Sequence, residues 1–306
     1  MVPGKKASPT ETRRVSITAF RLSSRAATDG NTMEQANRSR VERLSAEALA
    51  LLGTGAQIPP FSELHASFDL AEAYDVVGRV RELRRARGEV PVGRKIGFTN
   101  RSVWNGYGIS GPIWNYVFDR TVHDASSGTS ACTLDGFPEP RIEPELVLHL
   151  ATAPSAGMDE AELISCIDWV APGFEIVHSI FPGWRFSAAD AAAAFGVHAA
   201  LFAGQRRDVT ADRTQWARAL SQCEVEMSND RGRSRHGCGE NVLGGPLQAL
   251  RFLVDEIARY PACEPLRAGE LVTTGTLTEA MPAVAGETWT SRFTGIDLPP
   301  LSLSLR

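Results

Sequence analysis

The sequence lacks long apolar runs and has no surplus of positive charge. It contains no run of about 18 apolar residues, the length that a membrane-spanning helix requires. Its 32 Lys and Arg residues are outnumbered by 36 Asp and Glu, which gives a formal net charge of −4 and no basic footprint for nucleic acid. These absences argue against a membrane protein and against a nucleic-acid-binding protein.

Cysteine is also scarce, and its spacing argues against two structural roles. The five cysteines form no C-x-x-C pair and leave one thiol over if the others are paired: Cys132, Cys166, Cys223, Cys238 and Cys263. This pattern is typical neither of a zinc site nor of a disulfide framework. We therefore expect reduced thiols and a cytoplasmic protein.

The chain is long enough to bury a large core. With 306 residues and 43% apolar content, it can form one or two domains. Residues 1–32 differ from the rest because they are rich in Lys, Arg, Ser and Thr, which superficially resembles a transit peptide. An amphipathic helix pattern follows Met33 directly, so we expect Met33 to be the natural start and the preceding residues to be a disordered leader. Residues 33–306 are predicted to form a single domain.

Helices are predicted first along the chain, and strands later. Asp69 can cap a helix over residues 70–87, and Pro246 can open a further helix whose apolar residues recur on one face. Alternating or apolar segments predict strands over residues 220–228, 271–277, 288–293 and 301–305. The prediction is an α+β fold with a helical portion at residues 33–88 and a strand-rich portion at residues 89–306.

Two glutamates separated by a single residue are the most informative feature of the chain. Glu143 and Glu145 lie in a segment that alternates like a strand, so both carboxylates are expected on the same face. Adjacent like charges raise each other's energy, and a hard divalent cation between them is the usual remedy. The alternative is the solvated face of an edge strand, where acids are commonly found.

A third acid favours the metal interpretation. Glu175 lies within residues 169–177, where nearly every neighbour is apolar. A carboxylate in such a segment is expected to be buried, and burial without a partner is costly. Three carboxylates in one apolar setting suit an octahedral metal that keeps positions open for water or substrate. The sequence therefore predicts a Mg²⁺ or Mn²⁺ site at Glu143, Glu145 and Glu175.

Five short segments resemble one known family in their order along the chain. They are VGRKIGFT at residues 92–99, PRIEPE at 140–145, EIVHS at 175–179, LGGPL at 243–247 and TGTLTEA at 274–280. Together they look like the 2-keto-4-pentenoate hydratase and 4-oxalocrotonate decarboxylase branch of the fumarylacetoacetate hydrolase superfamily. The resemblance extends from about Ser45 to the C-terminus.

The resemblance implies a fold and a chemistry. It implies the strand-rich mixed β fold of the fumarylacetoacetate hydrolase C-terminal type, with Mg²⁺ or Mn²⁺ on the three glutamates. It also implies a small keto or enol acid as substrate, chelated by the metal, because a Lewis acid on a 2-oxo group stabilises an enolate. A homo-oligomer is implied as well, and a partner enzyme of the same pathway is a further expectation.

Lys95 is the expected catalytic residue. It matches the lysine of the family's G-x-K-I-G motif and lies where an apolar strand should enter the core. Near a metal and a substrate carboxylate it can neutralise charge, or act as acid or base once desolvation lowers its pKa. The alternative is a surface lysine, which is the ordinary location of this residue type.

Further residues are expected around the substrate. Thr276, in a Gly-flanked turn, can hydrogen-bond a carboxylate, and is otherwise an ordinary strand threonine. The resemblance adds Ser179 and Asp190 as substrate-binding residues. His178 follows a predicted metal ligand closely and is either a general base or, as we expect, a residue that hydrogen-bonds behind the ligands. No motif supports a catalytic role for His198.

Two segments depart from the family's pattern. The hydratases commonly carry acids in a D-x-P-D stretch, whereas residues 109–114 contain none, so the acids proposed to steer water are missing. The family's A-D-N-A-S segment is replaced by residues 189–196, which keep the aspartate but lose the amide and the hydroxyl. Trp104, Trp114 and Trp184 suggest a bulkier or less polar substrate if they line the pocket, and core packing or subunit contacts otherwise.

Four functions remain in view. The leading hypothesis is a metal-dependent lyase that hydrates a 2-oxo or 2-hydroxy-dienoic acid from aromatic-ring degradation. Decarboxylation of a vinylogous keto acid is the close alternative, supported by residues 277–280, and C–C hydrolysis of an acylpyruvate is a third. A non-catalytic partner subunit is the alternative from a different class. The carboxylate cluster and Lys95 argue against it, because a scaffold has no need of buried charges.

Overall fold

The computed structural model describes Met1 and residues 35–101, 104–107 and 111–306. The chain divides into two compact units, Met1–Arg43 and Leu44–Arg306. In the first unit the described residues 35–43 are helical. The predicted leader at residues 1–32 lies, apart from Met1, outside the described residues and stays a prediction.

Helices of the second unit begin and end where the sequence places caps. In α3 (Leu70–Ala86) the side chain of Asp69 accepts a hydrogen bond from the backbone of Glu72, as predicted for a cap. The predicted helix after Gly245 is α8 (Pro246–Ile257). The remaining helices are α2 (Phe61–Leu64), α4 (Trp104–Tyr107), α5 (Glu160–Ser165), α6 (Ala188–Ala193) and α7 (Arg213–Gln222), with 3-10 turns η2 (Asp119–Thr121), η3 (Pro182–Trp184), η4 (Phe195–Val197) and η5 (Gly239–Asn241).

The strands form two sheets within the described residues. The larger sheet has the order β2 (Ile113–Phe118), β1 (Pro91–Gly97), β11 (Leu271–Thr273), β5 (Arg141–Leu150), β6 (Ile167–Val177), β7 (His198–Ala203) and β3 (Val122–Asp124), while β12 (Met281–Pro282) pairs with β5 and β8 (Arg207–Asp208) pairs with β6. The second sheet has the order β10 (Ser234–Cys238), β9 (Glu224–Asn229), β13 (Thr288–Thr294), β14 (Leu301–Leu305) and β4 (Thr129–Cys132).

Two predicted strands are shorter than the pattern suggests. Residues 220–222 belong to α7, because the side chain of Asp212 caps this helix and the helix continues to Gln222 before β9 begins. Residues 274–277 leave the strand after β11, because Gly275 adopts a φ of 96° that an extended strand does not allow. The alternation in these segments therefore predicts the buried faces better than the strand ends.

The main apolar core lies where the two sheets face each other. Ile142, Phe174 and Ile176 from β5 and β6 pack in one cluster with Trp289 and Leu303 from the second sheet. Each fully buried side chain of this kind contributes about 1.5–3 kcal/mol through removal of apolar surface from water. Because side chains alternate along a strand, the opposite face of β5 and β6 is left for the acidic residues.

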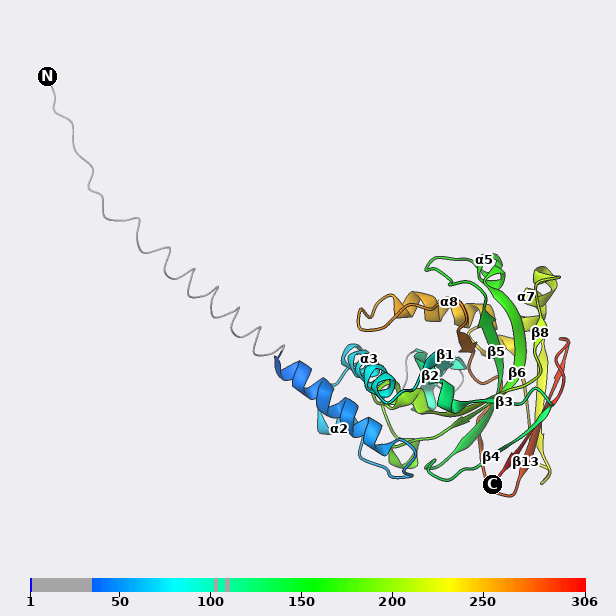
Figure 1. The fold of residues 1–306 in the computed structure, drawn as a ribbon, viewed down its shortest axis with the longest axis horizontal. Coiled ribbons are helices and arrows are strands. Elements are labelled where there is room, and N and C mark those ends of the chain that lie inside the picture. The colour runs from blue at the N-terminus through cyan, green and yellow to red at the C-terminus, as the bar shows by residue number, and fades with distance from the viewer. Residues whose placement is uncertain (2–34, 102–103, 108–110) are drawn as a thin grey trace. The chain divides into compact units, whose positions relative to one another are not determined.

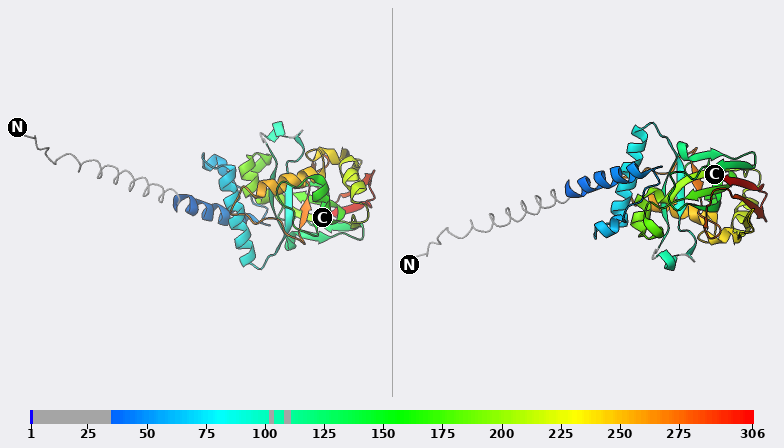
Figure 2. Two further views of the ribbon diagram at one scale, coloured as in Figure 1. Left: turned by 90° about the horizontal axis from the view of Figure 1, so that it is seen from above. Right: turned by 90° about the horizontal axis from the view of Figure 1, so that it is seen from below.

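The figures show how the second unit is arranged around this core. Strands β5 and β6 run side by side through it (Figure 1), and they pair in antiparallel register from Arg141↔Val177 onward. Helix α3 and the C-terminal strands lie at opposite ends of the unit in both views of Figure 2. Among the described residues, no helix combines the length and the apolar character needed to cross a bilayer.

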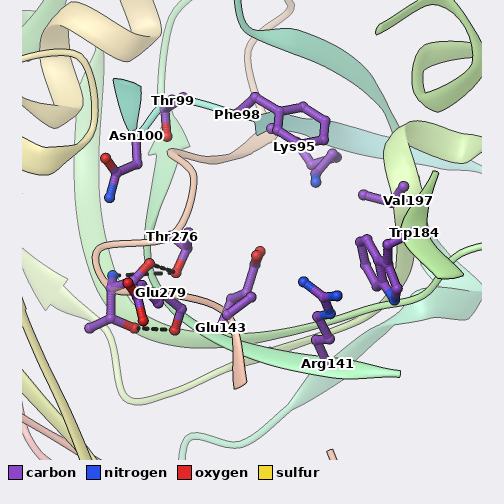
Figure 3. A pocket seen from close by; sticks show the side chains of 13 residues that line it. Lys95, Phe98, Thr99, Asn100, Arg141, Glu143, Trp184, Val197, Thr276 and Glu279 are labelled. Atoms are coloured by element: carbon purple, nitrogen blue, oxygen red, sulfur yellow. Dashed lines mark hydrogen bonds between the residues drawn. The ribbon is translucent and has the colours of Figure 1, made fainter. Parts of the chain in front are cut away.

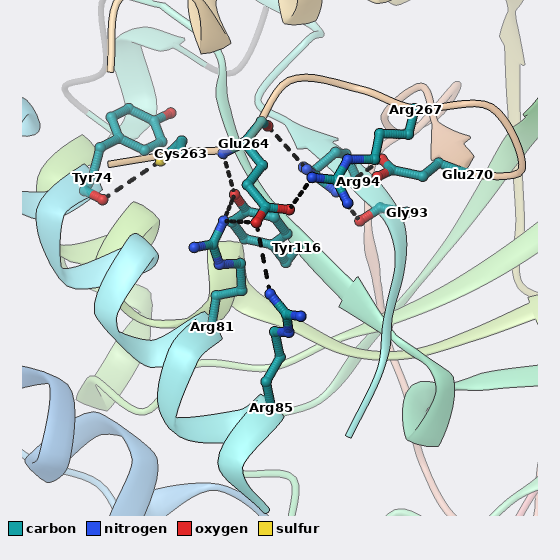
Figure 4. Close-up of polar contacts among 10 residues, drawn as sticks. All are labelled: Tyr74, Arg81, Arg85, Gly93, Arg94, Tyr116, Cys263, Glu264, Arg267 and Glu270. Atoms are coloured by element: carbon teal, nitrogen blue, oxygen red, sulfur yellow. Dashed lines mark hydrogen bonds and ion pairs between the residues drawn. The ribbon is translucent and has the colours of Figure 1, made fainter. Parts of the chain in front are cut away.

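Strand β1 is anchored by a buried arginine on the face opposite Lys95. Arg94 is 1% exposed, and its guanidinium donates to Glu270 at 2.9 Å and to the backbone oxygen of Glu264 at 3.1 Å. The same group lies 3.8 Å from the centre of the Tyr116 ring (Figure 4). Because neighbouring side chains on a strand point to opposite faces, these contacts also fix the direction in which Lys95 points.

We predict that Arg94→Met destabilises the fold strongly. The substitution leaves the carboxylate of Glu270, which is mostly buried, without its cation, and loss of one partner of a buried pair costs about 3 kcal/mol. Urea unfolding followed by circular dichroism measures the change. Arg79→Met is the matched control, since Arg79 meets Glu82 at the same 2.9 Å but in solvent, and should cost under about 1 kcal/mol. Equal losses in the two variants would contradict the prediction.

Candidate active site

Three glutamates meet on the face of β5 and β6 that turns away from the second sheet. Glu143 and Glu175 are direct partners across the two strands, and Glu145 lies opposite Gly173. Glu145 and Glu175 are 0% exposed. One carboxylate oxygen from each of the three lies within 4.8 Å of the others. The structure thus brings together the three acids that the sequence analysis selects.

The cluster is electrostatically strained when no cation is present. Burial, with the nearby charges of Glu175 and Glu143, raises the pKa of Glu145 well above its ordinary value. Burial also raises the pKa of Glu143 to about 7, although Lys95 opposes this. For Glu175 burial acts in the same direction, but Lys95 and His198 outweigh it and lower the pKa to about 2. These three carboxyl groups cannot all be ionised without a further positive charge.

Lys95 is the buried cation of this site. It is 1% exposed, its ammonium lies 3.4 Å from Glu175 Oε2, and it donates to the backbone oxygen of Gly196 at 3.0 Å. Burial alone would lower its pKa, but Glu175, Glu143 and Glu145 outweigh burial and raise it. The expectation that desolvation lowers the pKa of Lys95 is therefore wrong for this site. The three glutamates thus favour the charged form of the lysine.

The donor set fits a hard divalent cation. Glu145 Oε1 and Glu175 Oε2 are buried and have no hydrogen-bond partner among the described residues. The other oxygen of Glu145 accepts from the backbone N–H of Gly275 at 3.0 Å, and Glu175 Oε1 accepts from His198 at 2.6 Å. Buried carboxylate oxygens without partners are costly, and carboxylates are the ligands that Mg²⁺ and Mn²⁺ prefer. The protein therefore offers oxygens that a metal can bind.

A cavity of about 270 Å³ opens beside the acids. Lys95 and Glu143 project into it from opposite sides, and the guanidinium of Arg141 lies 4.1 Å from the Trp184 ring at its wall (Figure 3). Most of the exposed lining is apolar, because Phe98, Trp184, Val197 and Ala280 contribute to it. The cavity can hold a small acid with an apolar tail, since the cationic groups lie near the carboxylate cluster.

Backbone strain is concentrated in the walls of this cavity. Phe98, Trp184 and Val197 have positive φ values of 57°, 57° and 59°, a region that non-glycine residues seldom enter. For the β-branched Val197 this conformation is a clear outlier. Such strain persists only where surrounding structure enforces it, and it clusters at functional sites.

Thr99, rather than Thr276, has a hydroxyl without a hydrogen-bond partner among the described residues that line the cavity. The Thr276 hydroxyl donates to the backbone oxygen of Thr278 at 3.0 Å, so the turn itself uses it. Thr99 also lines the cavity, is 1% exposed, and its Oγ1 has no hydrogen-bond partner among the described residues. The sequence analysis missed Thr99 and Arg141 as lining residues, although both stand inside the segments that carry the family resemblance.

Two other predicted substrate-binding residues are structural. The hydroxyl of Ser179 donates to the backbone oxygen of Phe181 at 2.7 Å and accepts from its N–H. Asp190 is completely buried and closes a capping box with Ser187 at the start of α6. It also accepts from the backbone and hydroxyl of Ser62. Neither residue lines the cavity, so the assignment of Ser179 and Asp190 to the substrate is not retained.

The hydrogen bond to a predicted metal ligand that we expected of His178 is made by His198 instead. Neither ring nitrogen of His178 has a hydrogen-bond partner among the described residues, and its ring meets Phe137 edge to face. His198 instead lies opposite Val177, where a bulge interrupts the pairing of β6 and β7, and it contacts Glu175. The short sequence distance between His178 and Glu175 was misleading, because the chain leaves the strand after Val177.

The tryptophans divide between the core and the cavity. Trp114 is completely buried and stacks on Tyr74 at 4.9 Å, so it is a core residue. The ring of Trp104 donates to the backbone oxygen of Phe98 at 2.7 Å and does not line the cavity. Only Trp184 of the three lines it. In the segment at residues 109–114, residues 109 and 110 lie outside the described residues.

We predict that His178 makes the fold sensitive to acid. Burial lowers its pKa to about 4, whereas the ordinary value in an unfolded chain is about 6.5. Between these values the unfolded chain binds a proton that the folded chain excludes. The free energy of unfolding therefore falls by about 3 kcal/mol as the pH decreases from about 6.5 to about 4, with no effect above this range.

Urea unfolding at several pH values tests this prediction. His178→Leu should flatten the loss between pH 6.5 and pH 4, because the replaced ring nitrogens make no hydrogen bond. The exposed His236, replaced by Leu, serves as the control and should leave the loss unchanged. If His178→Leu and the parent protein lose stability equally, the histidine does not cause it.

Comparison with known proteins finds relatives of this chain. No family model matches the chain. It is 28% identical to a 2-keto-4-pentenoate hydratase of Paraburkholderia phymatum, over 84% of this chain and 95% of that protein. It is 26% identical to a 4-oxalocrotonate decarboxylase of Pseudomonas sp. CF600, over 78% and 87% respectively.

The fold has a solved counterpart. The structure of 4-oxalocrotonate decarboxylase from Pseudomonas putida G7, in complex with magnesium and adipate, superimposes with a TM-score of 0.79 at 24% identity. The match covers 88% of this chain and 98% of that one, so the two share the whole fold. The chain is therefore similar over most of its length to 2-keto-4-pentenoate hydratases and a 4-oxalocrotonate decarboxylase, as the resemblance in the sequence suggested.

Proposed function

We propose that this protein is a divalent-metal-dependent lyase that acts on a 2-oxo or 2-hydroxy-dienoic acid, as a hydratase, in the breakdown of aromatic compounds. One observation carries the proposal. Three glutamates, of which Glu145 and Glu175 are buried and have oxygens without a hydrogen-bond partner among the described residues, meet a buried lysine at the wall of a mostly apolar cavity. The names of the relatives support the same chemistry, since both hydratases and a decarboxylase are among them.

The metal is proposed to be Mg²⁺ or Mn²⁺, held by Glu143, Glu145 and Glu175. When bound, such an ion acts as a Lewis acid that polarises the 2-oxo group and stabilises negative charge on it. Chelation by the carboxylate and keto oxygens of the substrate is consistent with a cavity that opens directly beside Glu143. This assignment is supported by the oxygens of Glu145 and Glu175 that have no hydrogen-bond partner among the described residues.

The side chains around the cavity have separate proposed roles. Lys95 is a cation held between Glu175 and the Gly196 backbone, so it can balance charge and deliver a proton to the substrate. The hydroxyl of Thr99 can bind a polar substrate oxygen, and Arg141 adds a positive charge at the wall. Phe98 and Trp184 offer apolar surface to an unsaturated tail and exclude water from it.

Decarboxylation is the second candidate, for one structural reason. Among the described residues, Glu143 and Glu279 are the only acids that line the cavity, and Glu279 faces solvent beside Arg235. Hydration needs a group that positions water, whereas loss of carbon dioxide needs the metal and a proton donor only. Ultraviolet assays with a 2-hydroxy-dienoate and with oxalocrotonate separate the two reactions. Turnover of neither substrate by the metal-loaded protein would contradict the proposed function.

The proposal extends to the cellular location and the assembly of the enzyme. A cytoplasmic location is consistent with the reduced thiols that the cysteine spacing predicts, whereas a homo-oligomer with a partner enzyme of the same pathway is proposed from the family resemblance. All five cysteines are free, and four of them are buried. Size-exclusion chromatography with light scattering measures the oligomeric state.

We predict that Glu175→Gln abolishes turnover and weakens metal binding while the fold survives. The amide removes one of three negative charges and keeps the shape of the side chain. Isothermal titration with Mn²⁺ should give about one ion per parent chain and a much larger Kd for the variant. Glu279→Gln is the control, because Glu279 lines the cavity but lies outside the glutamate cluster, and its Kd should stay at the parent value. If the variant carrying Gln at all three glutamates binds Mn²⁺ as tightly as the parent, the metal assignment is wrong.

We predict that Lys95→Met lowers turnover by about 10²- to 10⁴-fold, the usual range for a positioned acid or base. Lys95→Arg should not restore activity, because guanidinium holds its proton too strongly to donate it and does not fit the space of an ammonium. Steady-state kinetics on the best substrate measures both variants. If Lys95→Arg keeps its turnover, Lys95 acts only as a positive charge. If Lys95→Met keeps its turnover, Lys95 has a structural role and no catalytic one.

A further inference from the structure

A hydrogen-bonded chain leads away from the glutamate cluster on the side opposite the cavity. His198 Nδ1 lies 2.6 Å from Glu175 Oε1, and His198 Nε2 lies 2.9 Å from the hydroxyl oxygen of Thr121. His198 is 3% exposed and Glu175 is completely buried. The cavity lining includes neither His198 nor Thr121, so these two residues have no direct contact with a substrate there.

The chemistry of the groups gives the direction of the bond to Glu175. Oε1 of this glutamate lies 2.6 Å from the ring nitrogen, and an ionised carboxylate can only accept. His198 Nδ1 must therefore carry the proton that it shares with Glu175. The Thr121 hydroxyl donates to the backbone oxygen of Phe118 at 3.0 Å, and its oxygen lies 2.9 Å from the other ring nitrogen, Nε2. Thr121 thereby fixes the edge of the ring that faces away from Glu175.

The hydrogen bond from His198 gives the two oxygens of Glu175 different surroundings. Oε1 is held by His198, while Oε2 is buried without a hydrogen-bond partner among the described residues and lies 3.4 Å from the Lys95 ammonium. A carboxylate fixed at one oxygen cannot rotate, so the other oxygen stays directed toward Glu145 and Glu143. Groups that orient metal ligands in this manner commonly change metal affinity 10- to 100-fold.

We propose that His198 and Thr121 are positioning residues that hold Glu175 as a one-oxygen metal ligand, with Oε2 presented to the ion. The inference rests on the proposed metal function of the three glutamates. It assigns no contact with substrate to either residue. The consequence is that metal affinity depends on a hydrogen bond made by a histidine that does not itself bind the metal.

Two amide substitutions at one position test the proposal without a change in polarity. The side-chain N–H of Asn reaches about as far as Nδ1 of histidine, and that of Gln about as far as Nε2. His198→Asn should therefore keep the bond to Glu175 and bind Mn²⁺ within about threefold of the parent Kd. His198→Gln should reach Thr121 instead and bind Mn²⁺ about 10- to 100-fold more weakly.

A second histidine–carboxylate pair supplies the matched control. His149 Nδ1 lies 2.6 Å from Asp168 across the same two strands, β5 and β6, but this pair is partly exposed and outside the glutamate cluster. His149→Gln should leave the Kd for Mn²⁺ unchanged. Isothermal titration of the metal-free full chain with Mn²⁺ gives all four values, and thermal melts show whether each variant is folded.

A spectroscopic readout examines the hydrogen bonds without any metal. In protein labelled with ¹⁵N-histidine, His198 should show a protonated Nδ1, and Thr121→Val should shift the resonance of its Nε2. The inference is overturned if Asn and Gln at position 198 have the same Kd, or if His149→Gln weakens binding as much as His198→Gln. A parent chain that binds no Mn²⁺ would overturn the proposed function together with it, whereas tight parent binding with unaffected variants overturns the inference alone.

Discussion

The meeting of three carboxylates around one point, two of them fully buried, is the constraint on which the rest of the structure depends. Each of these groups would prefer water, and together they repel one another. Lys95 is a buried cation beside them, and burial raises the pKa of Glu143 to about 7. The fold therefore stores an electrostatic cost that a divalent cation relieves. The core between the sheets supplies the stability that makes this cost tolerable, because it buries large side chains such as Phe174 and Trp289 completely.

Strands β5 and β6 connect that core to the site. One face of the pair carries apolar side chains into the contact between the sheets, and the other face carries the acids. Strict alternation means that a shift of one residue in this pairing would exchange the two faces. The same alternation operates in β1, where Arg94 is tied to Glu270 and Lys95 points to the glutamates. Long pairings and buried anchors thus hold the reacting groups in place.

The cavity depends on irregular backbone rather than on strands. Phe98, Trp184 and Val197 have left-handed conformations, and Gly196 permits the close approach of Lys95, because a Cβ there would lie 3.1 Å from the lysine Cδ. Such positions are strained and are maintained by their surroundings. The enzyme combines a rigid metal-binding face with short strained segments that shape the substrate space. Differences in these segments can alter substrate choice without disturbing the glutamates.

The sequence by itself determined the elements that follow from periodicity and caps. Alternation predicted that Glu143 and Glu145 share a face, the apolar neighbours of Glu175 predicted its burial, and five short segments indicated the family. Only the tertiary structure decided which distant groups meet these acids. His198 reaches Glu175 through pairing of β6 with β7, whereas the sequence pointed to His178, which is closer along the chain. The sign of the Lys95 pKa shift was also decided there, since it depends on the balance between desolvation and three carboxylates that come together only in the folded chain.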